Sequence, residues 1–149
     1  MTQNIKKITA LETFPVRYPV LRADKSIDSC HFDGDNLETT SHFGLFDKNN
    51  IIGVISIFEA KNNLFVTEKQ YQIRGMAVLE EHQKKGFGEK LILNSEKYCS
   101  VQKANLIWFN ARKKAIGFYE KMGYQVKGLP FEISEVGKHV IMFKKMSDE

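Results

Sequence analysis

Cysteine is scarce in this chain, and it contains no long hydrophobic run. Cys30 and Cys99 stand alone, without the spacing of a zinc or redox motif, and two cysteines cannot build the disulfide framework of a small secreted fold. No apolar stretch approaches the roughly 20 residues of a membrane span. The first residues also lack the apolar core of a signal peptide. These absences predict a cytoplasmic protein with free thiols and no membrane partner.

Charge of one sign is not concentrated anywhere in the sequence. The net charge is +4 and the pI is about 9.0, which would allow nucleic-acid binding. However, the basic pairs at 84–85, 113–114 and 144–145 are shorter than the runs that mark a nucleic-acid patch. Phe43, Phe58 and Phe87 fall on periodic core positions instead of alternating with lysines. A small basic nucleic-acid-binding domain is therefore the least favoured alternative.

The chain's length and hydrophobic pattern predict a single domain of mixed class. Its 149 residues suffice for one domain with a sizeable core, so we expect one domain over residues 1–149. Alternating apolar positions and the turn at 47–50 predict a hairpin of strands at 42–46 and 51–58. A capping box at 9–12 starts a helix, which Pro15 and Pro19 shorten or kink. Further strands are expected at 5–8, 69–79, 106–110, 124–127 and 138–146, and further helices at 86–100 and 112–122. Residues 23–41 are expected to form a loop or a short second helix, and residues 128–135 a loop.

Residues 83–88, Gln-Lys-Lys-Gly-Phe-Gly, separate an apolar strand from an amphipathic helix. Glycines in such a loop let backbone N–H groups approach a ligand, and the first helical N–H groups have no partners of their own. Lys84 and Lys85 add positive charge. A phosphate or pyrophosphate would suit this arrangement, although Gly-x-Gly also occurs in plain tight turns. The sequence is neither a P-loop nor a Rossmann fingerprint.

A second segment, at residues 106–123, adds to the functional signal of the loop at 83–88. An apolar strand at 106–110 leads into a helix that carries Tyr119 and stops at Gly123, a typical C-terminal cap. The spacing predicts that Ala111, Ala115, Phe118 and Met122 form a core stripe with Tyr119 at its edge.

Taken together, the two motifs resemble those of the GNAT superfamily of acyl-CoA-dependent N-acetyltransferases. That family carries Gln/Arg-x-x-Gly-x-Gly/Ala after its fourth strand, here Gln83 to Gly88, and a helix with Ala-x-x-Phe-Tyr-Glu-Lys-x-Gly-Phe/Tyr, here Ala115 to Tyr124. The resemblance covers about residues 40–146 well. It implies an α+β fold with a central, mostly antiparallel mixed sheet of six to seven strands, splayed in the middle and flanked by about four helices.

The resemblance implies acetyl-CoA as the cofactor and assigns residues to it. The loop and the start of its helix would bind the pyrophosphate, the backbone of the fourth strand would pair with the pantetheine arm, and polar or motif residues of the second segment would complete the site. The family often places an asparagine three residues before the helix alanine, where this chain has Arg112, so Asn110 is also open to a plain helix N-cap role. The cofactor-binding residues expected are Met76, Ala77, Val78, Gln83, Lys84, Lys85, Gly86, Phe87, Gly88, Glu89, Asn110, Ala115 and Phe118.

The resemblance also implies direct attack of an amine on the thioester in a ternary complex. Tyr119 occupies the family position of the general acid that protonates the leaving thiolate, and a phenol has a suitable pKa for that proton transfer. A backbone N–H near Val78 would stabilise the oxyanion. The general base stays open among seven residues, with the last two strands the most interesting region: His139, Glu132, Glu135, Glu59, Glu81, His31 and His42.

The acceptor would be a primary amine of a small molecule or peptide. No metal is expected, because Cys30 and His31 lack a second pair at metal-site spacing. A homodimer stays open, since dimers are frequent in the family. The main alternative to the enzyme is a non-catalytic acyl-CoA-binding or regulatory module, which would keep the loop at 83–88 and need neither Tyr119 nor a base.

Overall fold

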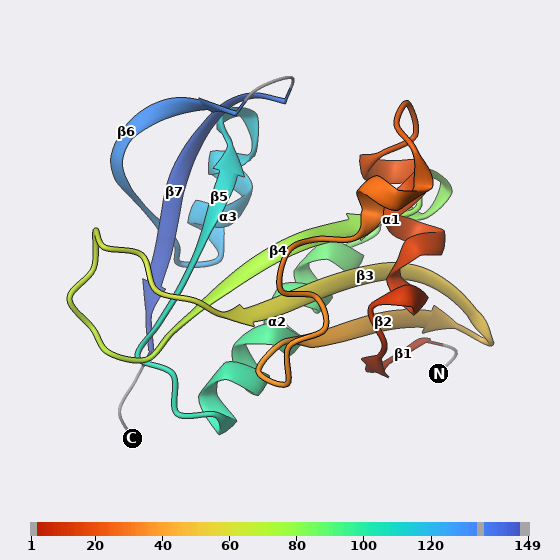
Figure 1. Cartoon of the computed structure of the whole chain (residues 1–149), viewed down its shortest axis with the longest axis horizontal. Coiled ribbons are helices and arrows are strands. Elements are labelled where there is room, and N and C mark those ends of the chain that lie inside the picture. The colour runs from red at the N-terminus through yellow and green to blue at the C-terminus, as the bar shows by residue number, and fades with distance from the viewer. Residues whose placement is uncertain (1–2, 134–135, 147–149) are drawn as a thin grey trace. The chain divides into compact units, whose positions relative to one another are not determined.

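A computed structural model describes residues 3–133 and 136–146 of the chain. In this described part, seven strands form one mixed sheet with the order β1-β2-β3-β4-β5-β7-β6 (Figure 1). The pairs β1–β2, β2–β3, β5–β7 and β6–β7 are antiparallel, and β4–β5 is parallel. The strands are β1 Gln3–Ile8, β2 Ser41–Asp47, β3 Asn50–Glu59, β4 Gln70–Val78, β5 Leu106–Arg112, β6 Gln125–Ile133 and β7 Gly137–Lys145.

The described helices comprise three α-helices and four short 3-10 segments. These are η1 Leu11–Thr13, α1 Phe14–Leu21, η2 Ile27–Cys30, η3 Glu80–His82, α2 Phe87–Val101, η4 Lys113–Ala115 and α3 Ile116–Lys121. The α+β class and the mixed sheet predicted from the sequence are confirmed. No helix in the described ranges has the length and apolarity needed to cross a membrane.

The chain divides into two compact units, which we describe separately. The first unit contains the residues up to Phe58 together with Ile73–Tyr98, and the second contains Glu59–Gln72 and the chain from Cys99 onwards. The β4–β5 register joins Gln70–Gln72 to Leu106–Trp108 inside the second unit.

Helix α1 packs on one face of the first unit's strands. The buried side chains of Ile8, Val16, Val54 and Ala77 form a cluster, with Val20 and Leu21 packed against it. The predicted capping box lies at the start of the 3-10 segment η1, which leads directly into α1: Thr9 N–H donates to Glu12 Oε1 at 2.7 Å and Glu12 N–H donates to Thr9 Oγ1 at 3.3 Å. Pro19 lies inside the helix, which ends at Leu21 after only eight residues.

Helix α2 packs on the opposite side of β3 from α1, against the residues that alternate with those facing α1. A Cβ added to Gly53 would lie 3.3 Å from Leu91 Cδ1 of α2, whereas the next residue, Val54, belongs to the cluster with α1. The Tyr98 ring of α2 packs edge-on against Phe43 of β2, with ring centroids 5.4 Å apart. Since successive strand residues point to opposite faces, α1 and α2 cover opposite faces of these strands. This explains why β3 is buried over most of its length.

The loop at 60–69 of the second unit is attached to the neighbouring strands by hydrogen bonds of its backbone and by one ring contact. Gln70 Oε1 accepts from Asn62 N–H at 2.8 Å, and Trp108 Nε1–H donates to Ala60 O at 2.9 Å. The Phe65 and Phe143 rings lie 5.1 Å apart. These contacts fix the loop against β5 and β7, the strands that carry the predicted chemistry of this unit.

One sequence expectation in the second unit is wrong, and another differs only at its start. The helix expected at 112–122 consists of the 3-10 turn η4 at Lys113–Ala115 followed by α3 at Ile116–Lys121, whereas Arg112 still belongs to β5 and pairs with His139 of β7. Residues 128–133 are part of β6 and not loop, with a register shift between Lys127 and Phe131. The position of Glu135 lies outside the described residues.

Candidate active site

The loop between β4 and α2 has the backbone geometry of a tight anion-binding turn. Lys84 and Gly86 both have positive φ angles, of 64° and 83°. Gln83 Nε2–H donates to Val78 O at 2.8 Å and so ties the loop to the end of β4. The first helical hydrogen bond runs from Lys90 N–H to Gly86 O at 3.2 Å. The N–H groups that precede Lys90 at this helix end therefore have no intrahelical partner and can bind an anion.

One side chain of this segment is buried in the core, and the others are exposed to solvent. Phe87 is buried, so it fixes the start of α2 and can offer a ligand only its backbone. Lys84, Lys85 and Glu89 are exposed. A Cβ added to Gly86 would meet no atom within 4 Å, which leaves open space beside the backbone. The predicted loop residues thus combine exposed N–H groups, two lysines and free access.

Strand β4 leads into this loop through an irregular backbone. Gly75 has a φ of 66° inside the strand, which indicates a bulge or bend. Ala77 is buried in the cluster with α1, while Met76 and Val78 are half-buried. Leu79 N–H donates to Ile52 O at 2.9 Å, so the strand is again held by β3 just beyond Val78.

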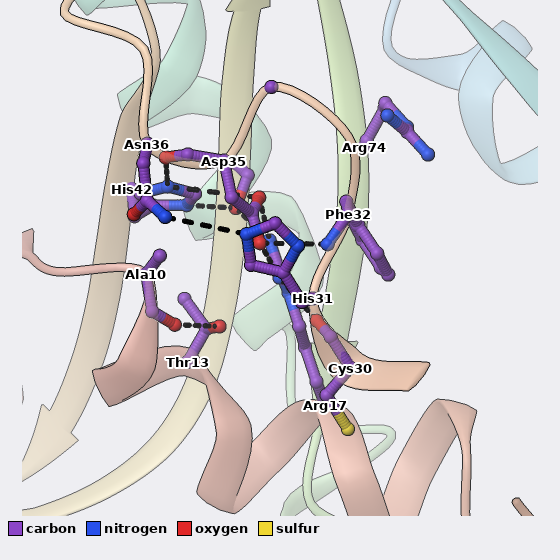
Figure 2. Close-up of polar contacts among 12 residues, drawn as sticks. Ala10, Thr13, Arg17, Cys30, His31, Phe32, Asp35, Asn36, His42 and Arg74 are labelled. Carbon is purple, nitrogen blue, oxygen red and sulfur yellow. Dashed lines mark hydrogen bonds and ion pairs between the residues drawn. The ribbon is translucent and has the colours of Figure 1, made fainter. Parts of the chain in front are cut away.

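A buried polar network lies on the α1 side of the first unit (Figure 2). We call it the Arg17 cluster: Arg17, Cys30, Asp35, His42 and Ser56. Arg17 and Asp35 form an ion pair at 2.7 Å with both side chains fully buried. Burial alone would raise the pKa of Asp35, but the hydrogen bonds and charge of Arg17 and the Phe32 N–H hold this pKa below its ordinary value. Burial lowers the pKa of His42.

Three guanidinium groups surround the Phe32 ring next to this cluster. Their Cζ atoms lie 3.8 Å (Arg17), 5.4 Å (Arg22) and 4.9 Å (Arg74) from the ring centroid. Arg74 belongs to β4 and also lies 5.1 Å from the Phe58 ring, and Figure 2 shows it beside Phe32. Its only described hydrogen bond is a long one, to Asp33 O at 3.4 Å. Burial lowers the pKa of Arg74.

In the second unit, Tyr119 lies in an aromatic cluster. Its ring centroid is 4.5 Å from that of Phe109, 5.0 Å from Phe118 and 6.4 Å from Tyr124. Burial raises the pKa of the Tyr119 phenol, so the proton stays on the oxygen at neutral pH. Phe118, expected in the core, is instead 42% exposed, and Ala115 is half-buried. The short α3 turns Tyr119 inward and Phe118 outward.

His139 of β7 has a defined orientation in the same unit. Its side chain is buried, and its Nδ1 lies 2.9 Å from Gly137 O. Because a carbonyl oxygen only accepts, Nδ1 carries the proton and Nε2 is left as the acceptor of the neutral ring. Arg112 pairs with His139 across the strands. Asn110 is exposed within β5 opposite Ile141, so it is not a helix N-cap.

The other candidate bases are placed less favourably. Glu59, Glu81, Glu132 and His31 are exposed. Both ring nitrogens of His42 are engaged, Nδ1 with Ser56 Oγ at 2.6 Å and Nε2 with Asp35 O at 2.9 Å. Within residues 3–133 and 136–146, no three His, Cys, Asp or Glu side chains gather as a metal site. Both carboxylate oxygens of Asp35 bind Arg17, so this acid is not free to bind a cation.

Sequence reasoning missed the Arg17 cluster. One signal was present, since Ser56 interrupts the apolar run Ile55-Ser56-Ile57 of a strand whose neighbours are fully buried. A buried hydroxyl needs a partner, and this one accepts from Arg17 Nη2 at 2.9 Å. Arg17 itself gave no signal, because an arginine on a short helix is ordinarily exposed.

Comparisons with known proteins agree with this arrangement. The sequence model of the acetyltransferase (GNAT) family matches residues 6–124. The uncharacterised N-acetyltransferase YitI of Bacillus subtilis (strain 168) is 31% identical over 142 residues, which cover 95% of each chain. Escherichia coli ElaA superposes with a TM-score of 0.79 at 13% identity, covering 96% of this chain and 99% of its own.

An aminoglycoside 6′-N-acetyltransferase in complex with coenzyme A also has the same fold. It superposes with a TM-score of 0.74 at 12% identity and covers 95% of this chain and 96% of its own. The two structural likenesses concern the fold, whereas the family match spans both sequence motifs, Gln83 to Gly88 and Ala115 to Tyr124. The chain belongs to the GNAT family of acetyltransferases.

Proposed function

We propose that this protein transfers the acetyl group of acetyl-CoA to a primary amine of a small molecule or peptide. The observation that carries the proposal is the β4–α2 loop, with left-handed Lys84 and Gly86, exposed lysines and a free helix end. Pyrophosphate needs N–H donors and positive charge, and Gln83 to Glu89 offer both. The backbone of Met76, Ala77 and Val78 would pair with the pantetheine arm.

The transfer is a direct attack without a covalent enzyme intermediate. The amine nitrogen forms a bond to the thioester carbon, the C–S bond breaks, and the thiolate leaves as free CoA. Tyr119 donates its proton to the sulfur, and the pKa that burial raises keeps the phenol protonated until that step. A backbone N–H near Val78 stabilises the oxyanion of the tetrahedral intermediate. Asn110, Ala115 and Phe118 complete the cofactor side.

His139 is the general base that we propose among the candidates. A primary amine is mostly protonated at neutral pH, so the reaction needs a group that removes a proton. The bond from Nδ1 to Gly137 O leaves Nε2 of the neutral ring as a proton acceptor. Glu59 and Glu132 are exposed and have no comparable orienting bond among the described contacts.

The charged side chains around Phe32 suggest which kind of amine the protein would accept. Arg17, Arg22 and Arg74 face Asp33 and Asp35 here, and Asp35 is already paired with Arg17. The surplus positive charge and the half-buried Arg74 favour an amine that also carries a carboxylate or phosphate. A panel of acceptors should therefore contain amino acids and phosphorylated amines beside polyamines.

Calorimetric titration with acetyl-CoA tests the proposal first. We expect saturable binding at one site per chain, and release of free thiol when an acceptor from the panel is added. Binding without thiol release for any amine would favour the alternative, a non-catalytic acyl-CoA-binding or regulatory module. Absence of binding at moderate salt would reject the proposal.

A further inference from the structure

Arg17 is a charged side chain buried inside the first unit, and both Nη atoms of its guanidinium make hydrogen bonds. Nη1 donates to Cys30 O and to Asp35 Oδ2, both at 2.7 Å. Nη2 donates to Asp35 Oδ1 at 3.1 Å and to Ser56 Oγ at 2.9 Å. Only Nε has no hydrogen-bond partner among the described residues. The guanidinium therefore joins α1, the segment 30–35 and β3 in one fixed geometry.

The ion pair cannot be explained by stability alone. Taking both charges out of water is costly, and well-packed apolar residues in place of such a pair are often neutral or stabilising. What the pair does supply is orientation, because a planar fork with four bonds permits one position of its partners. Asp35 Oδ2 also accepts from Phe32 N–H at 2.9 Å, so the network fixes the backbone that carries the Phe32 ring.

The Phe32 ring reaches β4 where that strand departs from extended geometry. A Cβ added to Gly75 would lie 2.8 Å from Phe32 Cε2 and 3.4 Å from Arg17 Nε. Arg17 stacks on the ring with its Cζ 3.8 Å from the centroid. The ring and the edge of the guanidinium therefore both lie against Gly75, and the strand has room for the ring only because residue 75 has no side chain. Met76, Ala77 and Val78 follow directly.

We propose that Arg17 is a positioning residue, which through Phe32 holds the bend at Gly75 and thereby sets the backbone of Met76–Val78 for the pantetheine arm. The Arg17 cluster contains none of the residues that we assign to the phosphate or the thioester, so its effect should be confined to the part of the cofactor that would lie along β4. This inference rests on the proposed use of acetyl-CoA.

The test compares two ligands that share a phosphate end. Adenosine 3′-phosphate 5′-diphosphate keeps the pyrophosphate and lacks the pantetheine arm, whereas acetyl-CoA has both parts. In Arg17→Lys and Ser56→Ala we expect acetyl-CoA affinity to fall at least about fivefold, and the affinity for the nucleotide to stay within about twofold. Ser95→Ala is the matched control, because it removes a buried hydroxyl that bonds Leu91 O within α2 and should change neither affinity.

Hydrogen exchange of the ligand-free protein supplies a readout that needs no cofactor. Peptides covering 31–36 and 73–78 should exchange faster in Arg17→Lys than in wild type. In Ser95→Ala their exchange rates should be unchanged. Phe32→Leu, which keeps an apolar side chain and removes the ring, should give the same pattern if Arg17→Lys does not fold. Equal weakening of both ligands, or unchanged exchange at 73–78 in these variants, would overturn the positioning role. A wild-type protein that binds neither ligand would instead reject the proposed function, and exchange alone would then decide whether Arg17 holds β4.

Discussion

Removal of the Tyr119 hydroxyl should separate the chemical step from cofactor binding. Tyr119→Phe keeps the ring that packs on Phe109 and Phe118 and removes only the hydroxyl. We expect kcat to fall on the order of 10²-fold, because general acid catalysis is lost, with acetyl-CoA affinity unchanged. Burial raises the pKa of Tyr119, so the alkaline limb of the wild-type pH–rate profile should lie above the ~10 of an ordinary tyrosine and vanish in the variant. Full activity of Tyr119→Phe would remove Tyr119 as the acid.

His42 should make the folded protein sensitive to acid. Its Nε2–H donates to Asp35 O, so Nδ1 of the neutral ring accepts from Ser56, which itself accepts from Arg17. Burial lowers the pKa of His42 in the folded state, and the unfolded chain therefore binds the proton more readily. The stability that the neutral ring contributes is complete above the unfolded pKa, ~6.5, and is lost as the pH falls towards the lower folded value.

Urea unfolding at pH 7.5 and pH 5.5 measures this effect. Wild type should lose stability between the two values. His42→Gln, which can donate and accept at similar positions without titrating, should start about 1–2 kcal/mol less stable at pH 7.5 and lose less on acidification. Equal losses in the two proteins would show that another group controls the acid response.

At the scale of elements, the β4–α2 turn depends on backbone conformation more than on side chains. Gly86 has a φ of 83° and open space around its missing Cβ. Gly86→Glu should abolish acetyl-CoA binding, because it adds a carboxylate where phosphate would lie. Gly128→Glu is the matched control, since Gly128 has nearly the same φ, 81°, with its nearest neighbouring atom 3.9 Å away. Calorimetry should find normal affinity in the control, and a loss in both variants would indicate general strain instead of a phosphate site.

The helices and strands could be predicted from the sequence where local signals are strong. The predictions were wrong where pairing between strands decides where an element begins or ends. The turn at 47–50 and the capping box at 9–12 gave the β2–β3 hairpin and the start of the first helix correctly. The helix expected at 112–122 is helical from Lys113 to Lys121 but starts with a 3-10 turn after Arg112, which pairs with β7, and no local pattern reveals such a partner. The core position expected for Phe118 is wrong, since its side chain is 42% exposed.

The candidate site divides in the same way. The turn at 83–88 could be predicted because the glycines and lysines that define it all lie within six consecutive residues. The Arg17 cluster was not, because it unites side chains that are 13 to 39 residues apart in sequence, as in the bonds of Arg17 to Cys30 and Ser56. The preference for His139 as the base also required the structure, which shows its Nδ1 bonded to Gly137 O.

At the scale of the whole molecule, binding of the proposed cofactor should stabilise the folded chain against heat. We expect one cooperative thermal transition for the chain, consistent with the single domain that the sequence predicts. Acetyl-CoA at about 100 times its Kd should raise Tm by roughly 5 to 10 °C, since binding to the folded state alone adds about 2.7 kcal/mol. Scanning calorimetry with and without acetyl-CoA measures this, with adenosine as a control that lacks every phosphate. Two separate transitions, of which acetyl-CoA shifts only one, would mean that the cofactor binds a single unit and that the chain does not unfold as one domain.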